Sequence, residues 1–391
     1  MTALHPSRLL AQLGSPLALP ALLISLFGIV MILSASSAIA LKYELSPIAF
    51  GVRQVVYLLV GVLAFLVMTN VPPGWLCKLR WWILLLVMLL LILVLFPGIG
   101  VEVNGARSWL DLGVARLQPI EFAKVALILY IAGQLRLHMP VGARLLDTIP
   151  LGALTGLAVL LIIQQPDFSG ALILVLVCGG MLFMAGMAWR VSLVLLGGCG
   201  ILLALPAYLA PYRLARLTAA LDPWADPTGS GYQMVNAMIA IGRGGWFGVG
   251  LGKSVQKYLY LPEAHTDFLL AITIEELGLL SLFGLVALYL LLLWRIVHTA
   301  RQCRRAENNF GYLCCWGVFW MLAGQSALTM GVNLAILPTT GLPLPFFSFG
   351  GSSLVASYLA LGLVAACSRA NQRLVPVDAP IIAPAEAGQN P

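Results

Sequence analysis

Long apolar runs separated by short polar segments make up the chain from about residue 17 to residue 370. A run of about 20 apolar residues is long enough to cross the hydrocarbon core of a bilayer as a helix. The pattern therefore predicts an all-α polytopic membrane protein. Its ten expected transmembrane helices cover residues 17–40, 51–70, 81–97, 118–135, 148–164, 170–187, 191–210, 267–297, 311–335 and 347–368. The eighth run is long for a single crossing, which indicates a helix that tilts or projects from the membrane.

The segments between these runs differ in charge. If residues 1–16 are cytoplasmic, ten crossings return residues 371–391 to the cytoplasm. The inner segments then hold 12 of the 22 Lys and Arg residues but only 4 of the 15 Asp and Glu residues. Short cytoplasmic loops are enriched in Lys and Arg, so this orientation is favoured. The end of the chain after Arg373 is rich in Pro and Ala and is expected to be a disordered cytoplasmic tail.

Composition agrees with a membrane protein. The chain is 61% hydrophobic and 9% charged, with a mean hydropathy of +0.97, whereas a soluble domain has about 25% charged residues. The net charge of +7 comes from the inner segments, so no nucleic-acid partner is expected. The first apolar run is too long for a cleavable signal peptide. No CxxC occurs among the seven cysteines and none lies in an expected outer loop, which favours packing residues over disulfides.

The outer side carries four unusual segments. They are residues 98–124, QPDFSG at 165–170, a large loop at about 211–266 between the seventh and eighth helices, and residues 337–353. Long irregular loops in compact proteins are usually functional. We therefore expect the site at the outer end of the helix bundle.

The sequence LPEAHTDFLLAITIEELG at 261–278 holds the strongest candidate. Asp267 falls where the eighth helix enters the lipid, two residues after His265. An ionisable group at the membrane edge of an apolar helix is costly, which makes Asp267 a functional-site candidate.

A second pair of charges lies at the start of the fourth span. Pro119 suits the first helical position, and Glu121 and Lys124 follow at i and i+3 on one face. Both should face the bundle, either as a structural salt bridge or as part of a functional cavity shared with Asp267. In the preceding segment, Asn104 and Gly105 predict a tight turn, and Trp109 suits the membrane interface.

The large outer loop contains a glycine-rich stretch, GRGGWFGVGLGKS, at 242–254. It is not a phosphate-binding P-loop, because no strand precedes it and position 247 is Phe where that motif needs Gly. Two interpretations remain open. The loop either receives an anionic head group through Arg243, Lys253 and Lys257, or it is an ordinary interfacial loop.

Three prolines, Pro338, Pro343 and Pro345, prevent regular helix in the fourth outer segment. Irregular backbone at membrane depth must be buried in protein or line a cavity. The following run Gly350 to Ser353 is small enough for close helix packing. His265 and Asp267 alone do not make a metal site, and no Ser–His–Asp triad is expected because the other histidines lie on the inner side.

An ordered set of motifs along the chain resembles the SEDS family, the polytopic peptidoglycan glycosyltransferases of shape, elongation, division and sporulation. The motifs are NGARSWLDLG, LQPIEFAK, QPDFSG, DPWADPTGSGYQ, GRGGWFGVGLG, LPEAHTDF, EELG and LPTTGLPLPFFSFGGSS, spread over residues 17–370. The stretch MGVNLAILPTTGLPLPFFSFGGSS is more similar to division members of the family than to elongation members. Two positions depart from the family pattern, with Ile120 in place of Ser and Phe349 in place of Tyr.

The resemblance implies a glycosyltransferase of the bacterial cytoplasmic (inner) membrane. Such enzymes polymerise lipid II, an undecaprenyl-diphosphate-linked disaccharide-pentapeptide, on the outer face. Division members work at the septum beside a class B penicillin-binding protein, the crosslinking transpeptidase, and other divisome membrane proteins. The resemblance implies that Asp267 is catalytic. The candidate residues of the surrounding cavity and substrate site are Glu121, Lys124, Trp109, Arg107, Asn104, His265, Arg243, Lys253 and Ser352.

The chemistry of glycosyl transfer agrees with these residue types. A carboxylate such as Asp267 can take the proton of the acceptor hydroxyl. Lys and Arg, or a divalent cation such as Mg²⁺ or Mn²⁺, can stabilise the leaving diphosphate. The sequence does not separate a base role of Asp267 from a cation-ligand role.

Other functions remain as alternatives. A flippase for the same lipid-linked precursor would also use polar residues in spans and broken helices, but it would need polar residues at the midplane and at an inner gate. An elongation-type polymerase and a scaffold that only recruits division proteins are the others.

Overall fold

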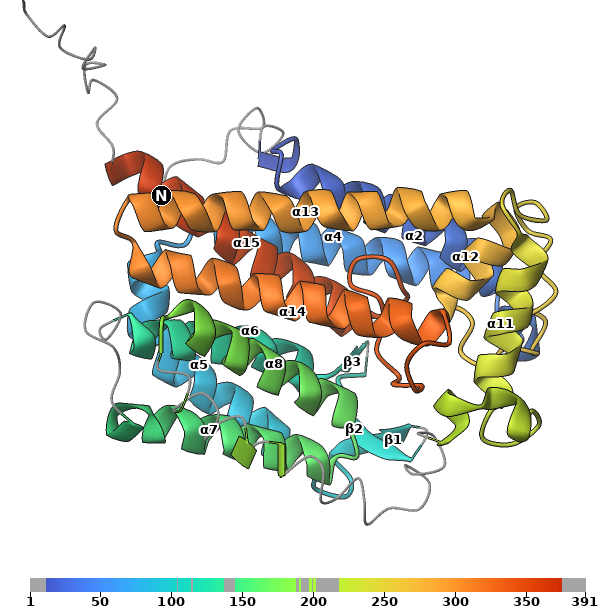
Figure 1. Cartoon of the computed structure of the whole chain (residues 1–391), viewed down its shortest axis with the longest axis horizontal. Coiled ribbons are helices and arrows are strands. Elements are labelled where there is room, and N and C mark those ends of the chain that lie inside the picture. Colours follow the sequence, from blue (N-terminus) through green and yellow to red (C-terminus); the bar gives the residue numbers. More distant parts are fainter. Residues whose placement is uncertain are drawn as a thin grey trace, which may run out of the picture.

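The computed structural model of the protein describes residues 12–103, 105–113, 115–136, 145–187, 190, 197, 198, 200, 201 and 218–374. Long helices lie side by side, and the sheet, the short helix α12 (Leu269–Leu277) and the helix α11 (Tyr232–Gly244) all lie at one end of them (Figure 1). We call this the outer end, because it holds all four segments that the sequence assigns to the outer side. The opposite, inner end holds the last turns of α13 (Leu279–Arg305) and α15 (Gly351–Leu374).

The helices follow the apolar runs closely. The structure has α2 (Ala18–Ala35), α3 (Ser37–Lys42), α4 (Ala49–Asn70), α5 (Pro73–Leu93), α6 (Pro119–Leu135), α7 (Leu145–Gln164), α8 (Phe168–Met184), α14 (Asn309–Asn333) and α15 (Gly351–Leu374). Among the described residues, six helices are long and apolar enough to cross a membrane: α2, α4, α5, α13, α14 and α15. The predicted seventh span, 191–210, falls mostly outside the described residues.

The predicted eighth span, 267–297, is wrong as one helix. The structure has two helices there, α12 (Leu269–Leu277) and α13 (Leu279–Arg305), separated by Gly278 at φ 78° and ψ 178°. The physical reason is that the glycine-rich loop takes over helical hydrogen bonds at the break. Gly250 N–H donates to Glu276 O at 2.9 Å, and Leu279 N–H donates to Gly245 O at 2.9 Å. The long apolar run is therefore shared by a short helix and a separate long one.

The expectation of an all-α chain also needs a correction. Residues of the first outer segment form a three-stranded antiparallel sheet of β1 (Gly100–Val103), β2 (Ala106–Asp111) and β3 (Arg116–Leu117), in the order β1-β2-β3. Val103 pairs with Ala106 across a hairpin whose Gly105 has φ 80°, which confirms the predicted tight turn. A turn residue with positive φ is a normal hairpin requirement.

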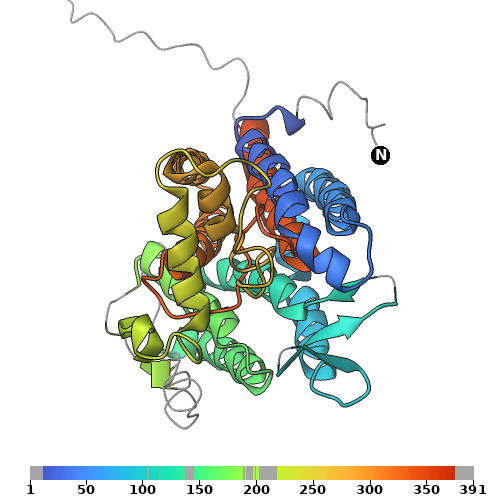
Figure 2. The same ribbon diagram turned by 90° about the vertical axis from the view of Figure 1, so that its right-hand side faces the viewer.

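The large outer loop is partly helical. It contains a short 3₁₀ turn, η1 (Pro223–Ala225), and the amphipathic helix α11 (Tyr232–Gly244), which packs against α12. In a view toward the outer end, α11 lies on one side and the sheet on the other, with irregular segments between them (Figure 2).

The core of the bundle is formed by α6, α8, α14 and α15. α6 is buried along nearly its whole length and contacts α5, α8, α14 and α15, while α4 packs along α15. A helix that is apolar all round and buried all round belongs in the interior of a bundle. As a result, polar residues at the start of α6 lie inside the protein and not against lipid.

Candidate functional site

A cavity of about 1910 Å³ opens at the outer end of the bundle. Its walls come from α4, the sheet, the first turns of α6, α8 and α15, and the last turn of α14. The segments just before α12 and α15 complete the lining. Ionisable side chains on the lining belong to Arg53, Asp111, Arg116, Asp167, Glu263 and Asp267. The cavity therefore combines carboxylates and guanidinium groups on an otherwise apolar wall.

Asp267 lies on this lining immediately before α12. Its backbone is fixed by α14, because Asn333 Nδ2 donates to Asp267 O at 2.7 Å while Asn333 Oδ1 accepts from Ala271 N–H at 3.0 Å. A Cβ added to Gly341 would lie 3.7 Å from Asp267 Oδ2. The carboxylate therefore lies close to the loop that precedes α15, with the cavity on its open side.

That loop, residues 337–350, lines the cavity as the prolines predict. Side chains of four surrounding helices donate to five of its backbone carbonyl groups. The donor–acceptor pairs are Ser169 Oγ to Thr340 O at 2.7 Å, Thr329 Oγ1 to Leu342 O at 3.1 Å, Gln325 Nε2 to Pro343 O at 2.9 Å, Gln54 Nε2 to Ser348 O at 3.1 Å, and the Tyr289 hydroxyl to Pro345 O. Buried backbone carbonyls need such partners, so the donors fix the shape of the lining.

Glu121 and Lys124 are buried one helical turn into α6, at 2% and 1% exposure. Lys124 Nζ donates to Glu121 Oε1 at 2.8 Å and to Gln325 Oε1 at 2.7 Å. They do not line the cavity themselves, but Gln325 connects them to Pro343 of the lining loop, and Asp167 of the lining lies close enough to interact electrostatically with both. The pair thus lies directly behind the cavity wall.

Asp167 is a site residue that the sequence analysis did not single out, although it noted QPDFSG as an unusual segment. Its Oδ1 accepts the Gly170 N–H at 2.8 Å and caps α8. Burial raises the pKa of its carboxyl, and the neighbouring Glu121 adds to this effect. The Gly170 hydrogen bond and Lys124 oppose it. The signal that could have found Asp167 is an acid at the start of an apolar helix, the same one that marked Asp267.

His265 is buried between aromatic rings and not in the open cavity. Its ring centroid lies 4.8 Å from that of Phe50 and 5.6 Å from that of Phe349, and its carbonyl accepts the Phe349 N–H at 3.2 Å. Burial lowers the pKa of the imidazole, against the opposing effect of Glu263. The ring packing and the hydrogen bond to Phe349 hold the His265–Asp267 segment against α4 and the loop before α15.

The remaining predicted residues from the sheet segment and from α15 lie on or near the cavity lining where the structure describes them. Trp109 and Ser352 line the cavity; Ser352 Oγ accepts the Gln118 N–H at 2.9 Å and thereby holds the segment after β3. Arg107 lies beside the lining and pairs with the exposed Glu102 at 3.4 Å. Asn104 lies outside the described residues.

Arg243, Lys253 and Lys257 are not among the lining residues. Arg243 Nε lies 3.5 Å from Glu275 Oε1, Lys253 is exposed on the glycine-rich loop, and Lys257 is buried against Glu276. The loop therefore does not bring these three charges to Asp267.

Arg53 and Arg116 line the cavity but were missing from the predicted site. Arg53 lies in the first turn of α4 with its guanidinium 5.9 Å from the Phe50 ring centroid. A single arginine near the start of an otherwise apolar helix was the available signal. Arg116 belongs to the sheet, and without the sheet its place on the lining could not be predicted.

Within the described part of the chain, no group of three or more His, Cys, Asp or Glu side chains is arranged to hold a metal ion. The lining carboxylates therefore do not present a ready-made cation site. The charged side chains on the lining are these carboxylates together with Arg53 and Arg116.

Comparison with known proteins gives a consistent family. Residues 16–373 match the FtsW/RodA/SpoVE family model, described as cell cycle protein. A curated "Probable peptidoglycan glycosyltransferase FtsW" of Hahella chejuensis is 43% identical over 357 residues, which covers 91% of this chain and 88% of the relative. A relative of the same name from Legionella pneumophila is 40% identical over 340 residues, covering 87% and 86% of the two chains.

Solved structures agree. A chain from a study of how polymerization and crosslinking are coordinated in a peptidoglycan synthase complex matches with a TM-score of 0.72 at 34% identity, covering 91% of this chain and 97% of the other. The rod shape determining protein RodA of Thermus thermophilus matches with a TM-score of 0.66 at 33% identity, covering 90% and 95%.

Proposed function

The chain belongs to the FtsW/RodA/SpoVE family of cell cycle proteins, and from this premise we infer that it is a peptidoglycan glycosyltransferase of the division type. The curated relatives carry that activity in their names. The observation that carries the inference at the level of the site is Asp267, which lies on the wall of the outer cavity beside the fixed loop 337–350. A large cavity with a few convergent polar groups is the expected form of a substrate site.

Lipid II is the proposed substrate. Its reactive part, a sugar linked to a diphosphate, fits a cavity with both carboxylates and guanidinium groups, and its lipid tail fits the apolar wall formed by Val52, Val56 and Val60 of α4. The reaction joins the acceptor hydroxyl to the anomeric carbon of the donor sugar and breaks the bond to the diphosphate. Asp267 takes the hydroxyl proton as general base, and Arg53 and Arg116 stabilise the charge of the leaving diphosphate.

A divalent cation, Mg²⁺ or Mn²⁺, is an alternative means of stabilising the leaving diphosphate, and it stays a variable of the assay. The alternative function, transport of the lipid-linked precursor, would need a passage to the inner end. The lining residues come from the outer segments and the outer parts of the helices, an arrangement that favours polymerisation over transport.

For the membrane arrangement we propose ten spans with both termini in the cytoplasm and the cavity on the outer face. The basic inner segments support this orientation. Its test is single-cysteine labelling in spheroplasts. An impermeant thiol reagent should modify Leu112→Cys in the exposed part of the sheet segment, and should modify Arg301→Cys at the inner end of α13 only after permeabilisation.

The partner we propose is a single-span class B penicillin-binding protein, with other divisome membrane proteins, at the division septum. The support is the similarity to a chain of a peptidoglycan synthase complex. A fluorescent fusion should collect at midcell. A uniform distribution along the side wall would instead favour the elongation role.

The decisive experiment uses the purified full chain, alone and with a candidate class B penicillin-binding protein, incubated with lipid II in detergent or nanodiscs. Glycan strands are separated by length, with and without Mg²⁺, Mn²⁺ or a chelator. Strands are expected in the presence of the partner and should be lost in the Asp267→Asn variant. Precursor movement across liposomes without any strand synthesis would overturn the polymerase assignment.

A further inference from the structure

The C-terminal end of α12 carries two adjacent carboxylates, Glu275 and Glu276, both at 0% exposure. They lie at the far end of the same short helix that begins two residues after Asp267. A helix of nine residues is about 13 Å long, so neither carboxylate reaches the substrate in the cavity, and neither lines it. A pair of buried carboxylates is costly unless each is fully compensated, which raises the question of what they hold.

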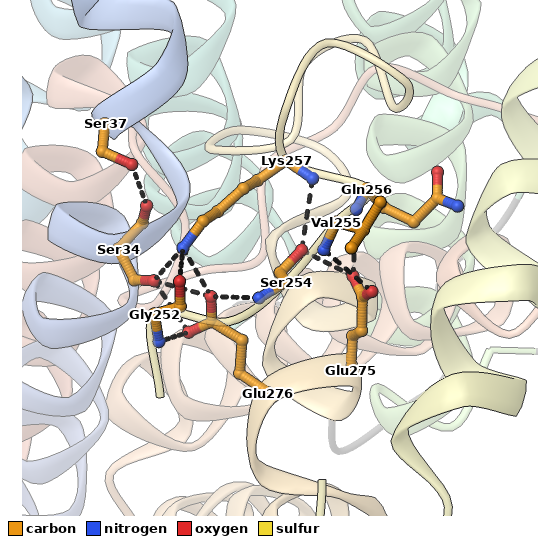
Figure 3. Close-up of polar contacts among 9 residues, drawn as sticks. All are labelled: Ser34, Ser37, Gly252, Ser254, Val255, Gln256, Lys257, Glu275 and Glu276. Carbon is orange, nitrogen blue, oxygen red and sulfur yellow. Dashed lines mark hydrogen bonds and ion pairs between the residues drawn. The ribbon is translucent and has the colours of Figure 1, made fainter. Parts of the chain in front are cut away.

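Glu276 joins three separate segments. Its carboxylate accepts from Lys257 Nζ at 2.9 Å, from the Gly252 N–H at 3.0 Å and from Ser34 Oγ at 2.7 Å (Figure 3). Lys257 is itself buried, and its ammonium also donates to Gly252 O at 2.7 Å and to Ser34 Oγ at 3.1 Å. The ion pair therefore connects the end of α12 to the glycine-rich loop and to α2.

Glu275 holds the same loop from the other side. Its carboxylate accepts the Ser254 hydroxyl at 2.5 Å, the Val255 N–H at 3.0 Å and the Gln256 N–H at 3.3 Å (Figure 3). Arg243 of α11 lies 3.5 Å from it. The two carboxylates together accept four backbone N–H groups of residues 252–256.

Two glycines allow the backbone of this region to lie directly against α12. A Cβ added to Gly248 would lie 2.2 Å from Glu276 O, and one added to Gly244 would lie 2.0 Å from Ile274 O. Glycine is thus required at positions 244 and 248 for this contact with α12. This explains the glycine-rich stretch, which the sequence analysis left between a head-group site and an ordinary loop, as a docking surface for α12.

The opposite end of α12 is held by Asn333, which bonds to Asp267 O and to Ala271 N–H. A short rigid helix held at both ends has a defined position along its axis and around it. Since catalytic groups must be placed to within a fraction of an ångström, a displacement of about 1 Å can cost up to about 100-fold in rate.

We propose that Glu276, paired with Lys257 and tied to α2 through Ser34, is a positioning residue for Asp267, acting through α12. This inference rests on the proposed function. It predicts that loss of the pair lowers kcat while the cavity still binds lipid II, because none of the three side chains lines it.

The test measures kcat and KM for lipid II with the purified full chain and its partner transpeptidase. The variants are Glu276→Gln, Lys257→Met, the double variant and Ser34→Ala, with Lys42→Met as the matched control at an exposed lysine near the outer end. We expect kcat to fall about tenfold for Glu276→Gln and Lys257→Met, with KM within about twofold. The double variant should lose no more than either single variant, because it leaves no unpaired buried charge. Lys42→Met should equal the wild type.

A second arm places Glu276→Gln on the Asp267→Asn background. If Glu276 acts through Asp267, adding Glu276→Gln should not lower the residual activity of Asp267→Asn any further. The double variant Lys257→Met/Glu276→Gln keeps the test usable if a single variant is too unstable to purify.

Three results would each overturn the inference alone: a raised KM at unchanged kcat, an unchanged kcat per folded molecule with only a lower melting temperature, or the same tenfold decrease on the Asp267→Asn background. If Asp267→Asn itself retained full activity, the catalytic assignment of the proposed function would fail, and this inference with it.

Discussion

Lys124 Nζ lies 2.8 Å from Glu121 Oε1, one turn earlier on the same helix, with side-chain exposures of 1% and 3%. The pair lies behind the cavity wall, and Gln325 completes the coordination of the ammonium at 2.7 Å. This is the geometry that compensates two charges in an apolar interior. The sequence left open whether the pair is structural or functional, and its place behind the wall favours a structural contribution.

Lys124→Met should therefore destabilise the folded protein strongly, since it leaves the Glu121 carboxylate buried without its cation. The expected loss is about 3–5 kcal/mol, measured as the change in unfolding free energy or melting temperature in detergent. The matched control is Arg107→Met, which breaks the partly exposed Arg107–Glu102 pair and should cost less than about 1 kcal/mol. Equal effects of the two variants would contradict the structural role.

Asp267→Asn keeps the size of the side chain but removes the base. Strand synthesis should fall by about 100-fold or more, while folding, membrane insertion and partner binding are retained. Glu263→Gln serves as the comparison, because Glu263 also lines the cavity but accepts the Thr266 hydroxyl at 2.9 Å; its effect should be milder. Near wild-type synthesis by Asp267→Asn would contradict the catalytic assignment and would make Asp111 and Asp167, the other carboxylates on the lining, the next residues to test.

The burial of His265 predicts a pH dependence of stability. Its pKa is lowered from the ordinary 6.5 by burial, so in the unfolded chain it takes up a proton at a higher pH than in the folded chain. Above the unfolded pKa, both states are neutral and the residue adds no pH dependence. As the pH falls below about 6.5, the unfolded state is favoured and stability is lost until the folded pKa is reached.

The measurement is the melting temperature of wild type and His265→Gln from pH 4 to 8. The difference between the two proteins should be constant above about pH 7 and should shift in favour of His265→Gln as the pH falls. Parallel curves over the whole range would show that His265 titrates alike in the folded and unfolded states.

The break between α12 and α13 predicts that Gly278 cannot be replaced. It has φ 78°, and a Cβ there would lie 2.3 Å from Trp246 O. Gly278→Ala should destabilise the protein by at least about 1–3 kcal/mol through backbone strain and this close contact. Gly284→Ala is the matched control within α13, where a Cβ meets nothing within 4 Å; it should be neutral or slightly stabilising. The measurement is thermal unfolding of both variants. Equal melting temperatures for Gly278→Ala and Gly284→Ala would contradict the prediction.

The hydropathy pattern predicts the helices well because a helix surrounded by lipid or by other helices is apolar along its whole length. Such a helix appears in the sequence as one uninterrupted apolar run. The start of α6 at Pro119 and the polar face with Glu121 and Lys124 follow from local rules alone. The expectation that the site lies at the outer end also agrees with the structure, because each of the four outer segments contributes residues to the cavity lining.

Features set by contacts between distant segments were harder to predict. The helix break at Gly278 depends on hydrogen bonds to the carbonyl of Gly245 and from the N–H of Gly250. The spacing of apolar residues carries no information about these two contacts. The sheet depends on pairing between Gly100–Val103 and Ala106–Asp111. The sequence places Arg243 in the substrate site and leaves Lys257 between a head-group site and an ordinary loop. Their partners in the structure, Glu275 and Glu276, lie on another helix.

The loop 337–350 has a consequence for the order of assembly. The side chains that hold its carbonyls come from α4, α8, α13 and α14, helices that lie up to hundreds of positions earlier in the chain. Without these helices, the five carbonyls lose the side-chain donors that hold them. The wall of the cavity can therefore take its final shape only after those helices have come together, which makes it one of the last parts of the molecule to mature.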